Sequence, residues 1–335
     1  MKVLSTIAFV CFIWFVASSG EVKTGSVEHL LKLIDDKVEN LNKDELNLRP
    51  MIGIMTQDVK NQAPYTTYIM AAYIKFVEAA GARAVPIRYN DTDEEILKTV
   101  SSLNGFLFPG GSMKLIEKDN NLTEYTRKGK LIYDYAKQQN DEGKYFPIVG
   151  TCLGFQELGV LEAPYADVLG HFSADDVADK LKFIGDPRKS KYFKSMDSNL
   201  LYEVQKLNIT YNHHSRGISR DMFKKYKELD EAFKVTSVSF DTKGVEYVAT
   251  MEHKKYPFYG TQYHPEKNTF IWKSDLKVPH SVEAIKLAEY SYNFFISEAR
   301  KNMNRFPSPE EEGKHRVENW PVVFTSGASQ DIYVF

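Results

Sequence analysis

Short apolar runs alternate with helical patterns along most of this chain, and this alternation restricts the fold more than any other feature. The apolar run 50–56 is followed by 68–82, whose apolar residues recur at helical spacing, and 84–87 is followed by 93–103 in the same way. Such an alternation is typical of βαβ units on a parallel sheet. The sequence therefore predicts an α/β fold, with a mostly parallel sheet and helices on both of its faces.

The rest of the chain continues this pattern. We expect further helices over 122–141, 152–161 and 281–302, and further strands over 105–111, 145–150, 233–241, 245–252, 256–264 and 321–326. Residues 165–230 are less regular and more charged, so we expect only short added strands and loops there. Because no repeat or low-complexity linker interrupts the chain, we expect one domain over 21–335 with its core at about 49–300.

The first twenty residues, "MKVLSTIAFVCFIWFVASSG", predict a secretory signal peptide. A lysine precedes an apolar core that is too short for a transmembrane helix, and small residues follow it. Three Asn-x-Thr sequons, at Asn90, Asn121 and Asn208, are typical of a glycoprotein. We therefore expect a secreted or lysosomal protein that has no membrane anchor.

Charge and cysteine content narrow the possibilities further. The net charge is −2 and both signs are mixed along the chain, which gives no support to nucleic-acid or membrane-surface binding. Cys11 lies in the predicted signal peptide, so Cys152 is the only cysteine expected in the mature chain, and no disulfide can form within it. A single thiol in an oxidising compartment is open to oxidation, and its presence favours a chemical role.

The surroundings of Cys152 indicate what that role is. The sequence Gly150-Thr151-Cys152-Leu153-Gly154 has the form Gly-x-nucleophile-x-Gly and lies between an expected strand and an expected helix. A turn this tight requires glycines where side chains would collide, and it exposes the central residue above the sheet edge. The helix N-terminus favours a thiolate and supplies the Leu153 N–H to an oxyanion. The alternative is a buried structural cysteine.

A base for this thiol is available in "GTQYHPEK", at 260–267. His264 and Glu266 follow an expected strand, and in extended backbone positions i and i+2 point to the same side. The Glu266 carboxylate can then accept the imidazole N–H and fix one tautomer of His264. We further expect His264 to form an ion pair with Cys152 that lowers the thiol pKa and raises the imidazole pKa. By itself, the tripeptide is more typical of a surface turn.

A third element is "FPGGS", at 108–112, which also follows an expected strand. The N–H groups of Gly110 and Gly111, with that of Leu153, are predicted to bind the negative oxygen of an acyl-transfer intermediate. The alternative for a glycine pair is an ordinary turn. All three elements follow strands, and in parallel sheets the sites gather at the carboxyl ends of the strands.

Taken together, "FPGG", "GTCLGFQ" and "YHPE" resemble the class I glutamine amidotransferase-like superfamily, whose triad lies on a flavodoxin-like sheet. Within that superfamily, "RPMIGIMTQ", "NHHSRGIS" and "TMEHKKYPFYGTQYHPEK" are similar to γ-glutamyl hydrolases over about residues 49–300. The resemblance implies Cys152 as nucleophile, His264 as general acid/base and Glu266 as its orienting carboxylate. It implies poly-γ-glutamylated folates and antifolates as substrates, no cofactor and no metal ion. A homodimer is compatible with it.

The resemblance also implies two substrate-binding residues. The histidine of the family's substrate site matches His214, next to the alternative His213, and the tyrosine of its first helix matches Tyr73. Without the resemblance, the two histidines are typical of a polar loop and Tyr73 of a half-buried helix.

Two other functions stay open at this level. One is a glutaminase that supplies ammonia to a partner, which the signal peptide disfavours. The other is a non-catalytic secreted binding protein on the same scaffold, which the complete set of Cys152, His264 and Glu266 disfavours. The sequence does not decide between removal of single glutamates and removal of longer tails.

Overall fold

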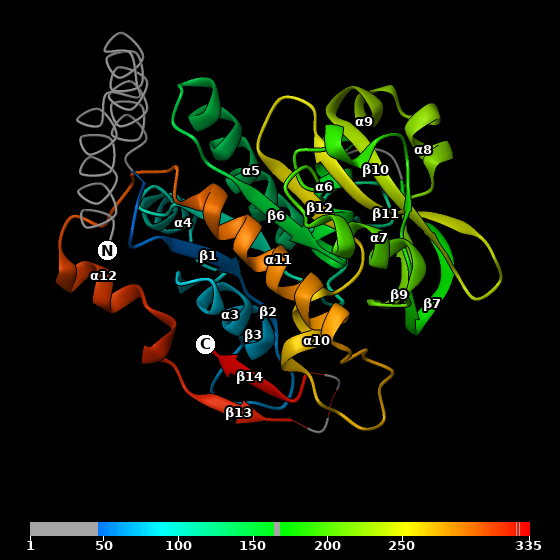
Figure 1. Ribbon diagram of the computed structural model, residues 1–335. Coiled ribbons are helices and arrows are strands. Elements are labelled where there is room, and N and C mark those ends of the chain that lie inside the picture. The colour runs from blue at the N-terminus through cyan, green and yellow to red at the C-terminus, as the bar shows by residue number, and fades with distance from the viewer. Residues whose placement is uncertain (1–45, 164–167, 326, 328) are drawn as a thin grey trace, which may run out of the picture. The chain divides into compact units, whose positions relative to one another are not determined.

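In the part of the chain that the structure describes, the central sheet has eight strands (Figure 1). The computed structural model describes residues 46–163, 168–325, 327 and 329–335. The strands are β1 (Met51–Met55), β4 (Arg83–Ile87), β5 (Gly105–Phe108), β6 (Ile148–Thr151), β8 (Lys182–Phe183), β10 (Phe233–Phe240), β11 (Glu246–His253) and β12 (Phe258–Thr261). Their order is β4-β1-β5-β6-β12-β11-β10-β8, parallel from β4 to β12 and antiparallel beyond it. The predicted mostly parallel sheet is confirmed.

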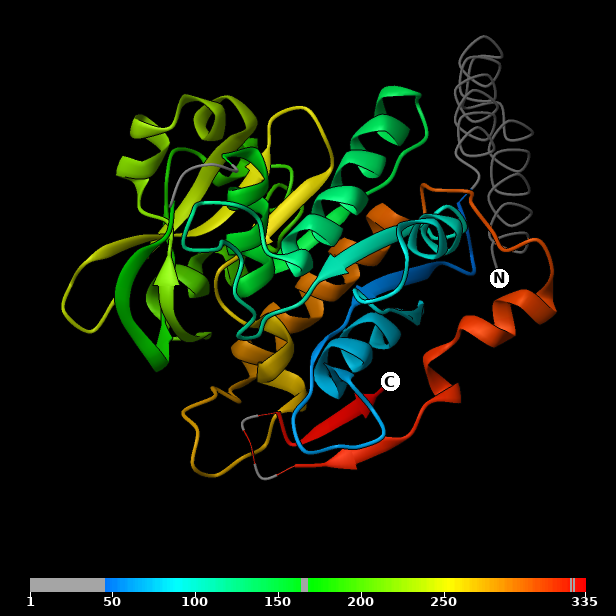
Figure 2. The same cartoon turned by 180° about the vertical axis from the view of Figure 1, so that it is seen from behind.

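Helices cover both faces of this sheet, as predicted. One face carries α3 (Ala71–Ala79), α7 (Ser198–Lys206) and α11 (Val282–Ala299). The other face, turned toward the viewer in Figure 2, carries α4 (Asp93–Val100), α5 (Glu124–Asp141), α6 (Leu153–Glu162), α8 (Arg220–Lys225) and α9 (Lys227–Ala232). Several helices begin at a capping side chain: Thr92 for α4, Thr123 for α5 and Ser281 for α11.

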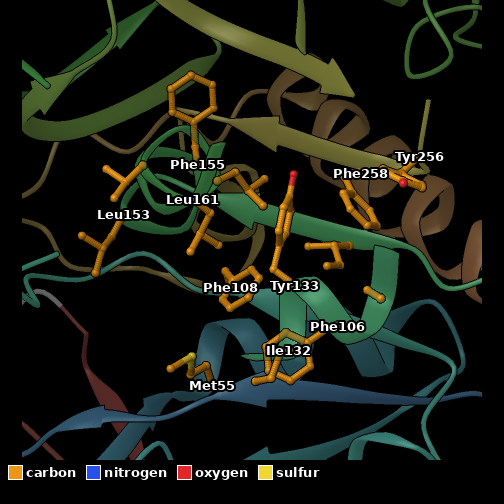
Figure 3. Packing of buried hydrophobic residues seen from close by; sticks show 14 of the residues in the cluster. Met55, Phe106, Phe108, Ile132, Tyr133, Leu153, Phe155, Leu161, Tyr256 and Phe258 are labelled. Carbon is orange, nitrogen blue, oxygen red and sulfur yellow. The ribbon is translucent and has the colours of Figure 1, made fainter. Parts of the chain in front are cut away.

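Alternation along the central strands divides the core into two clusters. Met51 and Met55 of β1 pack on the face that carries α4, α5 and α6, whereas Ile52 and Ile54 pack on the opposite face. Figure 3 shows the first cluster, where Tyr133 of α5 lies among the aromatic side chains of the strands. Because both faces are buried, these strands have continuous apolar runs, which is why their existence was predictable.

A second, smaller sheet was not predicted. It joins β2 (Gln57–Asp58), β3 (Thr67–Met70), β13 (Val322–Phe324) and β14 (Asp331–Val334) in the order β13-β14-β3-β2. The expected helix 68–82 is therefore wrong over its first residues, because 67–70 pairs with the C-terminal strand β14. That pairing joins segments more than 260 residues apart, and no local pattern reveals it.

Residues 165–230 hold more regular structure than the short strands and loops expected there, because α7 and α8 lie within them and α9 begins there. The expected short excursions in 165–230 include a two-stranded antiparallel sheet of β7 (Gly170–Asp179) and β9 (Thr210–Gly217). The remaining elements are η1 (Pro187–Lys189), α10 (Pro265–Phe270), α12 (Pro309–His315) and η2 (Val317–Asn319).

Residues 47–335 form one compact unit, so the folded chain extends past the expected core limit of about 300. The predicted signal peptide and residues 21–45 lie outside the described residues. No helix in the described part is long and apolar enough to cross a membrane.

Candidate active site

Four neighbouring strands direct the candidate site residues toward one edge of the sheet. β1, β5, β6 and β12 are adjacent and parallel, and the chain leaves their carboxyl ends at Gln57, Gly110, Cys152 and His264 respectively. The predicted gathering of the nucleophile, the glycine pair and the histidine at one sheet edge is therefore confirmed.

Cys152 occupies a strained turn between β6 and α6. Its φ is 52° and its ψ is −101°. Residues other than glycine rarely adopt this backbone conformation, which costs about 1–3 kcal/mol. A Cβ on Gly150 would lie 2.5 Å from the Gly154 carbonyl oxygen, and a Cβ on Gly154 would lie 2.0 Å from the Phe108 carbonyl oxygen. Both flanking glycines are thus required by close backbone contacts, as the sequence predicted.

Two backbone donors face the sulfur of Cys152. The N–H groups of Leu153 and Gly111 interact with the Cys152 thiol, and each lowers its pKa. A carbonyl oxygen that becomes negative during attack by this sulfur would lie near the same two donors. The sulfur itself makes only a weak contact, at 4.0 Å, with the His213 carbonyl oxygen.

Gly110 is held differently from Gly111, although both were predicted as oxyanion donors. The Gly110 N–H donates to the Tyr73 hydroxyl oxygen at 2.7 Å, and the Gly110 carbonyl accepts from Gln57 Nε2 at 3.1 Å. Because its N–H is already used, Gly110 does not present a donor to the sulfur here. The arrangement favours Gly111 and Leu153 as the donor pair, and the oxyanion role of all three residues stays a prediction.

His264 and Glu266 meet as predicted, but for a different local reason. His264 Nδ1 lies 2.7 Å from Glu266 Oε1, and both side chains are buried. The backbone is not extended after His264: Pro265 opens α10, and Glu266 lies in its first turn. Since a carboxylate only accepts hydrogen bonds, it holds the proton on Nδ1 and leaves Nε2 free to act as a base.

The imidazole, the thiol and Tyr73 converge over Gly110. A Cβ on Gly110 would lie 2.4 Å from the Tyr73 hydroxyl oxygen, 2.7 Å from His264 Cε1 and 3.2 Å from Cys152 Cβ. The Tyr73 hydroxyl oxygen also lies 3.3 Å from His264 Nδ1. Any side chain at Gly110 would therefore displace the groups on which catalysis is predicted to depend.

The expected ion pair between Cys152 and His264 is contradicted. Burial raises the pKa of the Cys152 thiol to about 12, although the charge of Lys267 opposes this rise. Burial, with a further contribution from Lys267, lowers the pKa of the His264 imidazole to about 4. Both groups are therefore neutral near neutral pH. The expected ion pair rested on the mutual attraction of the two groups and on the helix N-terminus, whereas the low-dielectric surroundings disfavour both charged forms.

These pKa values predict slow alkylation of the free enzyme. Iodoacetamide reacts with thiolates, so the native mature protein should react more slowly at pH 7–9 than a free thiol, whose pKa is about 8.5. The urea-unfolded protein, with the same single cysteine, serves as the control and should follow the ordinary thiol profile. Rapid alkylation of the native protein that continues below neutral pH would contradict these pKa values and support an ion pair between Cys152 and His264. The measurement is adduct formation by mass spectrometry against pH.

Lys267 is a site residue that the sequence argument missed. Its side chain is buried, its Nζ lies 5.3 Å from the centre of the Tyr211 ring, and burial lowers its pKa. Its charge affects the pKa of both Cys152 and His264. The available signal was its position directly after His-Pro-Glu in the motif itself.

A pocket of about 780 Å³ opens over the nucleophile. Its wall combines the elbow with two loops and both strands of the β7–β9 sheet, namely residues 111–118, 120, 152, 153, 156, 169, 175 and 213–216. Basic side chains outnumber acidic ones there, with Lys114, Lys118 and Arg216 against Glu117 and Asp175. In the described residues, no group of three or more His, Cys, Asp or Glu side chains is arranged to hold a metal ion.

The two predicted substrate-binding residues occupy different positions. His214 lines the pocket beside the Tyr247 ring, and burial lowers its pKa to about 3, so it is neutral. The alternative, His213, also lines the pocket and contacts Asp175 at 3.1 Å. Tyr73 lies outside the pocket wall and is 1% exposed, behind His264. Its substrate contact stays a prediction that its position does not support.

The three sequon asparagines, Asn90, Asn121 and Asn208, are exposed. Asn121 follows Asn120, which lines the pocket, whereas Asn90 and Asn208 lie outside the pocket wall. Their glycosylation stays a prediction.

Comparison with known proteins identifies consistent relatives. The family described as Peptidase C26 matches residues 50–266. The chain is 37% identical over 292 residues to γ-glutamyl hydrolase of Homo sapiens, covering 86% of this chain and 90% of the human protein. It is 35% identical over 295 residues to γ-glutamyl hydrolase B of Dictyostelium discoideum, covering 87% and 84% of the two chains.

A solved structure supports the fold alone. The glutaminase domain of Trypanosoma brucei CTPS, with bound acivicin, aligns with a TM-score of 0.50 at 14% identity. The alignment covers 76% of this chain and 94% of that chain. This likeness agrees with the mostly parallel sheet and its flanking helices.

Proposed function

The chain belongs to the peptidase C26 family of γ-glutamyl hydrolases, which are cysteine hydrolases, and we propose that it cleaves poly-γ-glutamylated folates and antifolates through a thioester on Cys152. One observation carries the mechanistic part of the proposal. The Cys152 sulfur faces the N–H groups of Leu153 and Gly111 at the wall of a pocket, and the His264–Glu266 pair lies behind the adjacent Gly110.

The reaction begins from neutral groups. As the sulfur attacks the γ-carbonyl carbon, His264 Nε2 accepts the Sγ proton and becomes an imidazolium paired with Glu266. The carbonyl electron pair moves to oxygen, where the Gly111 and Leu153 N–H groups stabilise it. When this intermediate collapses, the carbon–nitrogen bond breaks and His264 returns the proton to the leaving amine.

Hydrolysis of the thioester uses the same groups. His264 takes a proton from water, whose oxygen attacks the thioester carbonyl carbon. The carbon–sulfur bond then breaks, the γ-carboxyl product leaves, and the sulfur recovers its proton from His264. Each turnover consumes one water and returns every protein group to its starting state, so no cofactor takes part in the proposed cycle.

The pocket charge supports an acidic substrate. Each γ-linked glutamate carries a free α-carboxylate, so a tail presents one negative charge per residue. Lys114, Lys118 and Arg216 line the pocket beside the nucleophile. Attraction between these charges is worth little per exposed pair, but it favours an acidic chain over a neutral one.

Product lengths provide the test. The purified mature protein is incubated with a pteroyl pentaglutamate whose linkages are all γ, and with the α-linked isomer as a matched control. We expect cleavage of the γ-linked compound only, and the order of product lengths over time distinguishes single-residue from internal cleavage. Ammonia release from glutamine without γ-glutamyl cleavage would instead indicate a glutaminase, and neither activity would indicate a binding protein.

We also propose that the protein enters the secretory pathway and reaches the lysosome or the medium as a glycoprotein. The N-terminal sequence and three exposed sequon asparagines support this address. A gel-mobility shift of the cellular protein after enzymatic removal of N-glycans tests it, and an unshifted protein that stays in the cytosol would refute it.

A further inference from the structure

We infer that Gln57 is a positioning residue, whose carboxamide orients the Gly110–Gly111 peptide so that the Gly111 N–H faces the reacting oxygen. This inference rests on the proposed function, because that peptide is assigned there to the oxyanion site. In the sequence, Gln57 is noticeable only as the last residue of the motif "RPMIGIMTQ", at 49–57. Its place at the site depends on the adjacency of β1 and β5 in the sheet.

The planarity of the peptide bond couples the orientation of Gly110 to that of Gly111. In a trans peptide, the carbonyl of one residue and the N–H of the next point in opposite directions. The Gly110–Gly111 bond is trans, and the Gly110 carbonyl accepts from Gln57 Nε2 at 3.1 Å. Holding that carbonyl toward Gln57 therefore aims the Gly111 N–H away from it, on the side of Cys152, whose thiol pKa that N–H lowers.

The Gln57 carboxamide fits closely against the backbone of the glycine pair. A Cβ on Gly111 would lie 1.7 Å from Gln57 Oε1 and 2.5 Å from Gln57 Nε2. The carboxamide therefore packs against the backbone of Gly111 while it bonds to Gly110. Gln57 is 3% exposed and lies outside the pocket wall, so it acts through the loop and does not reach the substrate.

Gln57 is itself held in place by the pairing of its strand. Gln57 lies on β2, and β2 pairs with β3, directly before α3, which carries Tyr73. Tyr73 accepts the Gly110 N–H while Gln57 donates to the Gly110 carbonyl, so β2 and α3, which are joined through β3, hold this glycine from both sides. Without these contacts, a Gly-Gly peptide has the greatest backbone freedom of any dipeptide and rotates at little cost.

Two replacements of Gln57 distinguish its role in orienting the Gly110–Gly111 peptide from its role in packing. Gln57→Met keeps the length of the side chain but removes the donor. Gln57→Glu keeps the shape, repels the Gly110 carbonyl when ionised, and donates to it again through its carboxyl O–H when protonated. Gln139, a buried glutamine of α5 outside the pocket wall, supplies the matched controls Gln139→Met and Gln139→Glu.

Steady-state kinetics give the first readout. Removing one oxyanion donor commonly costs about 10²–10³-fold in kcat, and misorienting one while Leu153 remains should cost about 10–10²-fold. We expect that loss in kcat for Gln57→Met, with KM nearly unchanged, at every pH. For Gln57→Glu, activity relative to wild type should recover as the pH falls from 8 to 5, because burial favours the protonated acid. The Gln139 controls should match wild type.

Alkylation of Cys152 gives a readout that needs no substrate. A Gly111 N–H turned away from the sulfur no longer stabilises the thiolate, so iodoacetamide should react more slowly with folded Gln57→Met than with wild type. Unchanged kcat and alkylation in that variant would refute the role of Gln57. If Gln57→Met fails to fold, the pH dependence of Gln57→Glu tests the role of Gln57: recovery of relative activity at low pH supports it, and a loss that is the same at every pH refutes it. Slower alkylation together with an inactive wild type would refute the proposed function but keep this inference.

Discussion

Replacement of Cys152 by alanine is expected to reduce γ-glutamyl hydrolysis by at least about 10⁴-fold while leaving the fold intact. Alanine removes the only atom that forms the proposed thioester. The lost packing is small, because alanine keeps the Cβ and removes a single heavy atom, the sulfur that contacts the His213 carbonyl oxygen at 4.0 Å. Chromatography of the products measures the loss of hydrolysis. Circular dichroism and thermal unfolding measure whether the fold is kept.

The strained backbone at Cys152 supplies a matched control. Replacing alanine by glycine normally destabilises a protein by about 0.5–1 kcal/mol. At a φ of 52° and a ψ of −101° glycine relieves strain, so Cys152→Gly should be at least as stable as Cys152→Ala. Both variants should be inactive. Retained hydrolysis in either, or a cooperative unfolding transition that disappears in Cys152→Ala, would make this cysteine structural.

Replacement of His264 by alanine is expected to lower kcat by about 10²–10⁴-fold, because the imidazole transfers a proton in each half of the reaction. Replacement of Glu266 by glutamine should cost much less, about 10-fold. The amide oxygen still accepts the Nδ1–H that the carboxylate accepts at 2.7 Å, and so keeps the tautomer. Equal losses in the two variants would contradict this division of roles.

The pH profile tests the protonation state of the same histidine. A general base must be neutral, and burial lowers the pKa of His264 to about 4. Activity should therefore persist through mildly acidic pH and decline only as the pH falls through about 4. The charge of Glu266 raises the His264 pKa, so Glu266→Gln should move this acid limb to lower pH. A limb near 6.5 in wild type would indicate a solvated imidazole.

Much of the fold was predictable because its cause is local. Strands such as β1 and β5 are buried on both faces and have apolar runs, and the helices after them have apolar residues at helical spacing. The wrong predictions concern strands that pair with segments far away in the sequence. β3 was predicted as part of a helix because its partner strand, β14, lies at the other end of the chain. The contact of His264 with Glu266 was predicted, but its helical geometry was not.

By itself, the sequence determined the elbow at Gly150, because the collision that Gly150 avoids is with the Gly154 carbonyl oxygen of the same turn, whereas Gly154 avoids the Phe108 carbonyl oxygen of the neighbouring strand β5. It also determined which residues meet, since parallel strands bring their carboxyl ends to one edge. Only the tertiary structure decided that Cys152 and His264 are neutral, because burial sets the energy of a charge. Only the structure separated Gly110 from Gly111, because Gln57 and Tyr73 reach that loop from strands and a helix brought beside it by folding.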